Sequence, residues 1–556
     1  MQSYFPRVYN TDGEFSLRLT IHRAVFFVLL FLLVAAQPVS NFMMSGMEIL
    51  LAVNWLLEWD MRRKWANAKK SGTLPMLVAF LVLMGVHLLW LLSTSNMDYG
   101  WNDIFKKLPL VAIPLVLLTS LPPTRKQLEF IFLGFVTSVA VASVVGLIRY
   151  FTITDLPYRQ IVPFISHIRF SLNVCLAIII VVLFLAKRAT GKPQWADPLW
   201  WTCVALLILF LTILLKIRSF TALVLLFVTS ALMIAIFWRR MPSALFRKAV
   251  LSAFLLLTVA IVSLSAVMVH QYYSPVCLMQ KPLPAYTLNG NPYTHNPDGI
   301  VENGNVVDNY VCEVELRRHW PEVSNTDIDA ITPNGYAVYP TLIRYLNGLG
   351  TTKDSVGIMM LSPEDVDAIE RGVANPVYLR GSSIRQMYYV MLFEYENYRR
   401  WGCVKDFTML ERLELWHNAW RVFLKHPLLG VGTGDVFDAC RAQLIADESP
   451  INDTKKHPHN QYLSFLVAFG LTGFVAIVVA FVWALRRGKM LQMPAAAAYF
   501  IIVLISFLSE DTLETLAGCV FATLSCCLFQ HYRLQCWKPM GLGLERGEEL
   551  SKKLGS

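Results

Sequence analysis

The chain is poor in charged residues. Only 16% of its 556 residues are Asp, Glu, Lys or Arg, whereas 55% are hydrophobic. A soluble domain carries roughly 25% charged residues, so the composition excludes an ordinary soluble protein. The deficit comes from many apolar stretches of about 16 to 25 residues, which are long enough to cross a hydrocarbon core of about 30 Å. The sequence therefore predicts an all-α polytopic membrane protein.

Further absences narrow the function. The sequence has no CxxC spacing and no tight His/Cys cluster, so a structural zinc site is not expected. We expect neither a metal nor another cofactor, although Glu510-Asp511 is an acidic pair. No internal repeat is visible, which disfavours a secondary transporter. The net charge of +10 lies in short loops, as membrane orientation requires, so nucleic acid is not an expected partner.

About twelve spans are predicted, near 24–40, 42–57, 75–94, 107–121, 128–150, 170–186, 199–215, 219–238, 249–270, 461–485, 495–509 and 514–530. The spans at 42–57 and 107–121 are short, so tilted or re-entrant segments stay open there. The predicted organisation is a membrane domain of nine spans (1–270), a large and mainly helical loop domain (271–460), three further spans (461–532) and a tail (533–556).

Positive charge orients these spans. If the N-terminus is cytoplasmic, every second loop is cytoplasmic, and those loops carry the Lys and Arg clusters, as the positive-inside rule requires. Examples are Arg62-Arg63-Lys64, Arg239-Arg240 and Arg486-Arg487. The opposite loops are poor in Lys and Arg. This orientation places the long loop and the ends of several spans on the outer face.

Two arginines then stand out at the outer face. Arg169 begins the sixth span next to His167, and Arg218 lies in the turn after the seventh span next to Lys216. A single arginine at a span end usually extends toward the interface. The positive-inside rule disfavours cations here, however, and a guanidinium matches phosphate oxygens two at a time. The pair is therefore a candidate pyrophosphate clamp.

A histidine pair marks the start of the tenth span. His457-Pro458-His459-Asn460 stands where the polar loop enters the membrane, and histidine is the side chain best suited to move protons near neutral pH. His459 is the favoured catalytic residue, and His457 is expected at the rim of the site. A helix predicted over 406–425 carries Arg412, which by itself is a solvated or capping residue.

A glycine-rich turn follows that helix. Gly430-Val431-Gly432-Thr433-Gly434-Asp435 has alternating glycines but no surrounding strand-turn-helix unit of the dinucleotide-binding kind. A tight turn that brings the backbone close to another segment is the favoured interpretation, and an anion-binding nest is the alternative. The loop cysteines at 277, 312, 403 and 440 allow two disulfides, with three possible pairings.

These residues resemble the O-antigen ligase family. The resemblance rests on His459-Asn460, the spacing to Gly470-x-x-Gly473, and the preceding segment from His426 to Gly434. That superfamily also contains O-antigen polymerases and protein O-oligosaccharyltransferases. The span plan fits a GT-C-like fold, and the Ser509–Thr515 hairpin and the insert near 300–400 resemble the Bacteroidetes branch.

The resemblance implies a reaction and its partners. A glycan moves from undecaprenyl pyrophosphate to lipid A–core at the periplasmic face of the bacterial inner membrane. Arg169 and Arg218 correspond to the family's pyrophosphate-binding arginines, His459 to its functional histidine, and Arg412 to a cationic loop position. His459 is expected either to take the proton of the acceptor hydroxyl or to hydrogen-bond the diphosphate. Inversion at the anomeric carbon is expected. The polymerase and O-oligosaccharyltransferase activities stay open, as does the oligomeric state.

Overall fold

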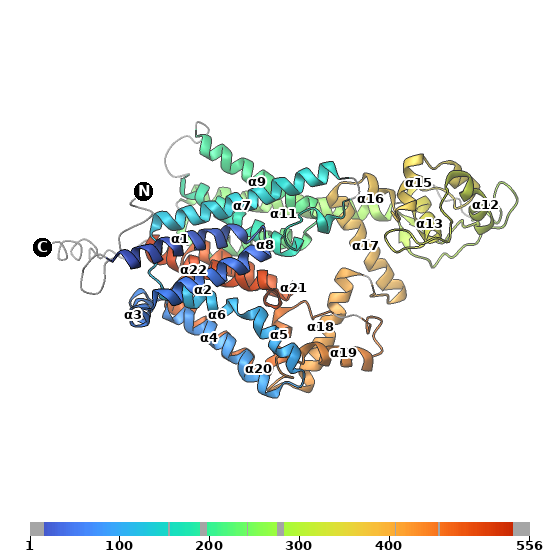
Figure 1. Cartoon of the computed structure of the whole chain (residues 1–556). Helices are drawn as coiled ribbons and strands as arrows, with labels where there is room; N and C mark the ends of the chain where they lie inside the picture. Colours follow the sequence, from blue (N-terminus) through green and yellow to red (C-terminus); the bar gives the residue numbers. More distant parts are fainter. Residues whose placement is uncertain are drawn as a thin grey trace. The chain divides into compact units, whose positions relative to one another are not determined.

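The computed structural model of the chain describes residues 16–153, 156–188, 197–241, 243–274, 283–405, 407–453 and 456–536. Helices dominate these residues (Figure 1), and the strands are the short antiparallel pair β1 (Val301–Glu302) and β2 (Asn305–Val306). The predicted class, an all-α polytopic membrane protein, is confirmed.

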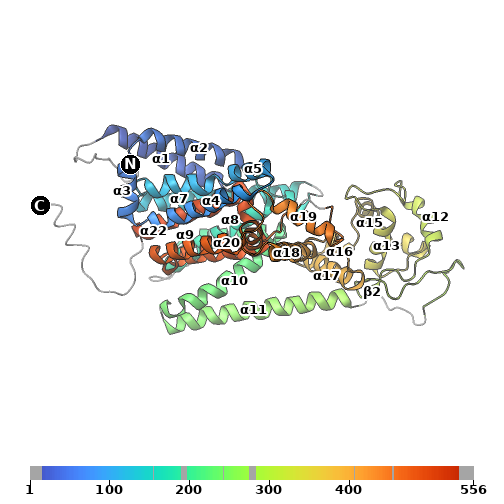
Figure 2. The same cartoon turned by 90° about the horizontal axis from the view of Figure 1, so that it is seen from below.

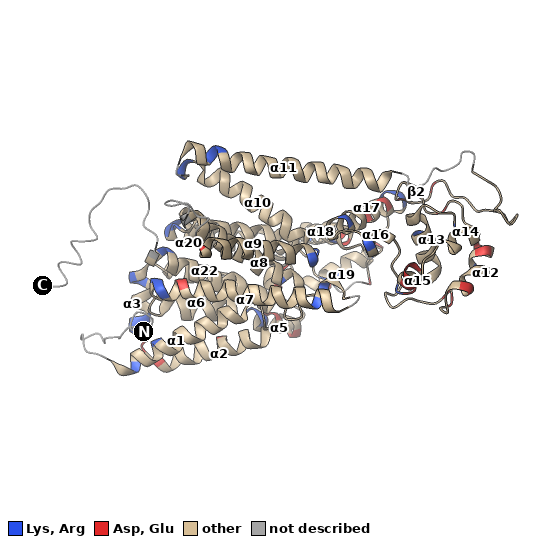
Figure 3. Ribbon diagram, turned by 90° about the horizontal axis from the view of Figure 1, so that it is seen from above, with Lys and Arg blue, Asp and Glu red and all other residues tan. Residues whose placement is uncertain are grey.

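Eight helices within the described residues are long and apolar enough to cross a membrane. Their Lys and Arg residues gather near the helix ends, and the long ribbons between are almost free of charge (Figure 3). These helices are α1 (Leu17–Ala36), α4 (Leu74–Leu89, extended by η1 to Ser93), α7 (Arg125–Thr152), α8 (His167–Arg188), α9 (Pro198–Lys216), α10 (Phe220–Phe237), α11 (Ala244–Tyr273) and α20 (Gln461–Gly488).

The other four predicted spans correspond to shorter or less apolar helices. They are α2 (Asn41–Glu58), α6 (Pro109–Thr119), α21 (Pro494–Ser509) and α22 (Leu516–Cys536). The 11 residues of α6 rise only about 17 Å at 1.5 Å per residue, which is less than the thickness of the hydrocarbon core. Its first residue is a proline, and α5 (Met97–Lys107) precedes it.

The chain forms two compact units. The first consists of Met1–Arg239, Asn418–Gln443 and Lys455–Ser556. Its helices run alongside one another in both views (Figures 1 and 2), with α20 packed along α4, α1 along α2, and α22 against α6. Small residues permit this close packing. A Cβ on Gly134 of α7 would lie 2.3 Å from the ring of Phe31 on α1, and Phe31 also stacks on Phe130.

The second unit consists of Arg240–His417 and Leu444–Thr454. It contains α11, α17 (Ser383–Trp401) and a lobe of short helices around fully buried Trp320 and Leu342. In that lobe Arg344 forms a two-pronged ion pair with buried Glu302, at 3.0 and 3.1 Å. The short helices are α12 (Glu313–Val323), α13 (Val338–Leu349), α14 (Ser355–Met359), α15 (Pro363–Glu370) and α16 (Pro376–Arg380).

The helix predicted over 406–425 is α18 (Thr408–Lys425), and its residues are divided between the two units. The disulfide prediction needs correction: Cys312, Cys403 and Cys440 are free thiols. Cys312 is buried in the second unit, whereas buried Cys440 belongs to the first. Cys277 lies outside the described residues.

Candidate functional site

His459 stands immediately before the cap of α20. Asn460 caps this helix, because its side-chain oxygen accepts the N–H groups of Tyr462 and Leu463 at 3.1 Å each. His459 itself has a φ of 53°, in the left-handed region that residues other than glycine rarely adopt. Its side chain is one-third exposed. The turn therefore presents an accessible imidazole at the start of a long apolar helix.

Asp511 holds this turn in place. It belongs to the 509–515 hairpin, defined here as the residues from Ser509 to Thr515 that join α21 to α22 and contain η6 (Thr512–Glu514). Its carboxylate accepts the N–H of His459 at 2.6 Å, the N–H of Asn460 at 3.1 Å and the hydroxyl of Ser464 at 2.6 Å. Burial raises the pKa of Asp511, and the Ser464 hydroxyl opposes that shift. The backbone of the histidine turn, defined here as residues 457–460, is thus attached to a hairpin about 50 residues downstream.

Glu510 of the same hairpin lies beside the imidazole. Its Oε2 is 4.0 Å from Nδ1 of His459, which is within ion-pair range but longer than a hydrogen bond. A carboxylate at this distance favours the protonated imidazole. The arrangement suits a histidine that gains a proton during a reaction.

Arg169 reaches the hairpin from another helix. Its guanidinium donates to the carbonyl of Asp511 at 3.0 Å and to the hydroxyls of Thr512 and Thr515 at 3.3 and 3.1 Å. The residue is only 8% exposed. The structure therefore brings Arg169 and His459 onto one hairpin, a link that the sequence analysis did not predict.

The other predicted cations lie around two tyrosines. The guanidinium of Arg218 is 5.4 Å from the centre of the Tyr158 ring. The ring of His167 is 6.0 Å from the same tyrosine ring. The ammonium of Lys216 lies 4.3 Å from the ring of Tyr150 and within 3.3 Å of its hydroxyl. Cation–π contacts of this kind hold guanidinium and ammonium groups at partly exposed positions.

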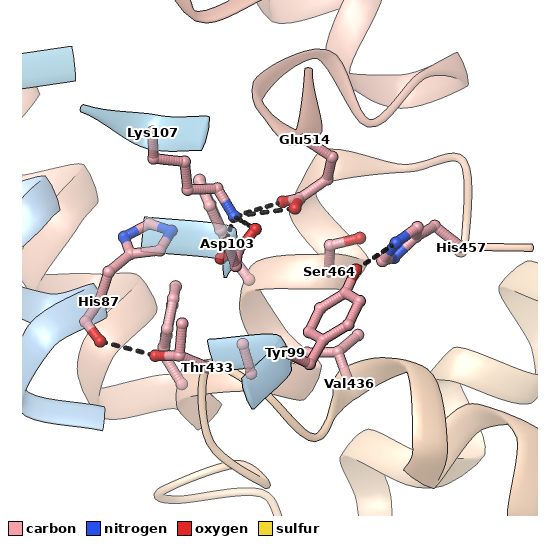
Figure 4. Close-up of a pocket in the computed structure, with 12 residues that line it drawn as sticks. His87, Tyr99, Asp103, Lys107, Thr433, Val436, His457, Ser464 and Glu514 are labelled. Carbon is pink, nitrogen blue, oxygen red and sulfur yellow. Dashed lines mark hydrogen bonds and ion pairs between the residues drawn. The ribbon is translucent and has the colours of Figure 1, made fainter. Parts of the chain in front are cut away.

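A small cavity lies next to the histidine turn (Figure 4). It has about 20 Å³ of space for the centres of water-sized molecules, which is enough for one water. His457 is on one side, where its Nε2 is 2.8 Å from the hydroxyl of Tyr99. The lining residues are His87, Tyr99, Asp103, Lys107, Thr433, Val436, His457, Ser464, Phe465, Ala468, Phe469 and Glu514.

Three charged side chains converge in this cavity, and the sequence analysis missed all of them. Lys107, 2% exposed, donates to Asp103 at 2.6 and 2.7 Å and to Glu514 at 2.8 and 2.9 Å. Asp103 and Lys107 are one helical turn apart, next to an apolar stretch. Ionisable pairs at such positions carry function or specific pairing, and that signal was available in the sequence.

The two carboxyl groups of this cluster, Asp103 and Glu514, differ in pKa. Burial and, after it, the neighbouring Glu514 raise the pKa of Asp103 to about 7. Burial also opposes ionisation of Glu514, but Lys107 overcomes this effect and lowers the pKa of that carboxyl below its ordinary value. Of the two carboxyl groups, Asp103 therefore binds a proton more readily than Glu514.

The glycine-rich turn forms backbone hydrogen bonds with α20 at a break in that helix. At Gly470 the backbone leaves the helical conformation, with φ 59° and ψ −166°. Residues of the turn replace the missing helical bonds, since the N–H groups of Val431 and Gly432 donate to the carbonyls of Val467 and Ala468 at 2.9 Å each. Leu471 and Thr472 in turn donate to the carbonyls of Pro427 and Leu428. Every one of these backbone groups is satisfied inside the protein, as a membrane-embedded break requires.

Glycine is necessary at this crossing. A Cβ on Gly470 would lie 2.3 Å from the Leu428 carbonyl, and a Cβ on Gly434 would lie 2.3 Å from the Asn96 carbonyl. Asp435 then accepts the N–H groups of Ser95 and Asn96 at 2.7 Å each, just before α5. The N–H groups of the turn already have acceptors, which favours close packing over an anion nest.

Arg412 lies half-buried on α18 and belongs to the second unit, whereas the 509–515 hairpin belongs to the first. Among the residues with described positions, no group of three or more His, Cys, Asp or Glu side chains is arranged to hold a metal ion.

Fold and site together define a polytopic membrane protein with a polar site at the end of its apolar helices. Residues 387–478 match the family model described as O-antigen ligase, and this part of the chain is an O-antigen ligase family domain. The match includes the glycine-rich turn, the histidine turn and the Gly470 break, so the resemblance seen in the sequence is confirmed for this region. A match to this family indicates a glycosyltransferase-like enzyme, and the family implies polysaccharide and lipid-linked substrates in general. A comparison with curated proteins finds no match.

Proposed function

We propose that the protein is an O-antigen ligase that transfers polysaccharide from undecaprenyl pyrophosphate to lipid A–core. The observation that carries the proposal is the 509–515 hairpin, which holds the main chain of His459 on one side and the guanidinium of Arg169 on the other. A base for an acceptor hydroxyl and a cation for a leaving diphosphate are thereby attached to one hairpin. The family match supplies the class of substrate.

The chemistry needs these two kinds of group. A diphosphate is a stable anion, so it leaves without much acid catalysis, but cations must stand where its charge develops. The acceptor is a sugar hydroxyl that does not ionise at neutral pH. A positioned histidine that removes its proton during attack contributes typically 10²–10⁴-fold in rate.

We assign the base role to His459. Its imidazole takes the hydroxyl proton as the new glycosidic bond forms and the bond to the diphosphate breaks. Glu510, 4.0 Å away, stabilises the imidazolium that results. A single displacement inverts the anomeric carbon. No step in this mechanism requires a metal, and activity that survives EDTA would agree with it, whereas loss of activity that Mg²⁺ restores would contradict it.

Membrane orientation completes the proposal. The distribution of the Lys and Arg clusters supports a periplasmic position for the start of α20, the hairpin and the turn after α9, at the bacterial inner membrane. The lipid-linked donor and lipid A–core would meet there.

Replacement of His459 by alanine tests the mechanism. We expect at least a hundredfold loss of ligation by purified protein with a normal expression level and unfolding temperature. His270→Ala, at an exposed position near the end of α11, is the matched control and should keep full activity. Wild-type ligation by His459→Ala would rule out both a base and a diphosphate-binding role for this residue.

Deletion of the gene tests the reaction. A ligase deletion leaves lipid A–core without polymer, while full-length chains accumulate on the lipid carrier. Single repeat units on lipid A–core would indicate a polymerase instead. Normal lipopolysaccharide with unglycosylated proteins would indicate a protein O-oligosaccharyltransferase.

A further inference from the structure

One face of α5 contacts both the histidine turn and the 509–515 hairpin. Tyr99, Asp103 and Lys107 are spaced four residues apart on this helix, so they lie on one side of it. All three side chains line the small cavity (Figure 4). Tyr99 contacts the histidine turn, with 2.8 Å between its hydroxyl and Nε2 of His457. Lys107, two helical turns further on, contacts the hairpin.

Lys107 joins α5 to the hairpin through Glu514. Its ammonium lies between two carboxylates and donates to both oxygens of Glu514 and to both oxygens of Asp103 (Figure 4). Two carboxylates this close repel each other unless a cation lies between them, and solvent screens buried charges only weakly. Without the ammonium, Glu514 either moves away from Asp103 or one of the two carboxyls takes a proton. In both cases Glu514 loses its charge-assisted hydrogen bonds to α5.

Gln461, the first residue of α20, couples Glu514 to the histidine turn. Its side-chain NH₂ group donates to Glu514 at 3.3 Å, and its side-chain oxygen accepts the N–H of Leu513 at 2.8 Å. Gln461 is fully buried and lies two residues after His459. These bonds add to those that Asp511 makes with the histidine turn. The hairpin and the turn are thus attached at two places, so a shift of Glu514 is passed on to His459.

The other end of α5 is held independently of Lys107. Asp435 accepts the N–H groups of Ser95 and Asn96 at 2.7 Å each, and the side-chain amide of Asn96 donates to Asp438 at 2.8 Å. Both aspartates lie at or directly after the glycine-rich turn. Because these contacts fix the start of the helix, α5 can hold the hairpin in place through Lys107 at its end.

We propose that Lys107 is a positioning residue for the glycosyl transfer, which fixes the 509–515 hairpin through Glu514 and thereby the imidazole of His459. The proposal rests on the function proposed above, in which His459 takes the proton of the acceptor hydroxyl. A general base must lie within hydrogen-bond reach of that proton, and a displacement of about 1 Å can cost a hundredfold in rate. Lys107 itself is buried and bound by two carboxylates, so it acts without contacting a substrate.

Amide hydrogen exchange, measured by mass spectrometry on the full-length protein in detergent, tests this dependence. Lys107→Met keeps an unbranched side chain and removes the charge. We expect exchange in the peptides that cover 457–464 and 509–515 to accelerate at least tenfold. Arg344→Met, which removes the buried ion pair with Glu302 in the second unit, is the matched control. It should accelerate exchange around Glu302 and leave both peptides at the wild-type rate, whereas wild-type exchange of both peptides in Lys107→Met would overturn the proposal.

Steady-state kinetics, expressed per folded protein, separate positioning from substrate binding. Lys107→Met should lower kcat at least tenfold and leave KM for the lipid-linked donor and for the acceptor within about twofold. Glu514→Gln should lower kcat as well. The double variant should lose no more than the worse single variant, because both substitutions remove the same link. A raised KM with an unchanged kcat, or losses that multiply in the double variant, would overturn the proposal.

Glu514→Gln also serves if Lys107→Met does not fold, because it nearly keeps the shape of the side chain and removes its charge. Exchange in the same two peptides should then accelerate and kcat should fall, and wild-type values of both would overturn the proposal. That result would leave the proposed function standing, since the His459 and deletion experiments decide it.

Discussion

Asp511 holds His459 by its main chain, with 2.6 Å between Asp511 Oδ2 and the His459 nitrogen. The contact is made by the main chain of a residue in the left-handed region, with φ 53°. The main-chain carbonyl of Asp511 also accepts a hydrogen bond from Arg169. The position of the imidazole therefore depends on a carboxylate that never needs to touch a substrate.

Replacement of Asp511 by asparagine tests this dependence. An amide has one oxygen, so its NH₂ group faces one of the N–H donors that the carboxylate accepted. A buried donor that loses its acceptor costs about 1–3 kcal/mol. We expect kcat to fall at least tenfold, with little change in KM for the donor, and the unfolding temperature to decrease.

Asp453→Asn is the matched control, because Asp453 forms an exposed ion pair with Lys405. Exposed pairs contribute about 0–1 kcal/mol, so this variant should behave like wild type. Wild-type kcat in Asp511→Asn would show that the hairpin does not position His459.

The sequence predicted the helices better than the contacts between them. Apolar runs and basic loops are local patterns, so each predicted span has a helix. His459 and Arg169 were identifiable from local context too. Their common support on Asp511 was not, because the hairpin lies 52 residues beyond His459 and 342 beyond Arg169, and no local pattern reports which distant segments meet.

The charged cluster in the cavity also depends on a contact between distant segments, which local sequence patterns do not predict. Asp103 and Lys107 could have been recognised as an ionisable pair beside an apolar stretch, but their partner Glu514 lies 407 residues from Lys107. The sequence favoured a tight turn for the glycines at 430–434. The segment they approach, the broken helix at Gly470, is evident only from the structure.

The stability of the protein should depend on pH through Asp103. Its folded-state pKa is raised from 3.8 to about 7 by burial and by Glu514. Between these values the folded state binds more protons than the unfolded state, so stability decreases as pH rises across this window. Glu514, whose pKa is lowered from 4.5, acts with the opposite sign, but below pH 4.5.

Asp103→Asn should remove this dependence. We expect the difference in unfolding free energy between wild type and Asp103→Asn to fall by at most about 1.4 kcal/mol per pH unit between pH 5 and 7, and to level off above pH 7. Thermal unfolding in detergent at pH 5, 6, 7 and 8 measures this. A difference that is constant across the range would contradict a raised pKa for Asp103.

The break in α20 should not tolerate a side chain. Gly470→Ala places a Cβ 2.3 Å from the Leu428 carbonyl, at a φ of 59°. Neither backbone can give way, because each supplies hydrogen bonds to the other. We expect a loss of more than about 2 kcal/mol in stability and poor expression. Gly85→Ala on α4, where no atom lies within 4 Å of the new Cβ, should express normally. Equal stability of the two variants would show that the crossing is flexible.

Arg218→Gly separates stability from binding. Arg218 follows the end of α9 in the left-handed region, with φ 50°, which glycine adopts without a steric cost, so the variant should gain about 1 kcal/mol in stability. It also loses a cation near Tyr158, and we expect at least tenfold weaker pyrophosphate binding. Chemical unfolding and calorimetry on the same preparation measure both quantities. Arg218→Lys, which keeps the charge but not the planar fork, should show an intermediate affinity and no gain in stability. A glycine variant that is more stable and binds as well as wild type would mean that the strain at Arg218 has no role in anion binding.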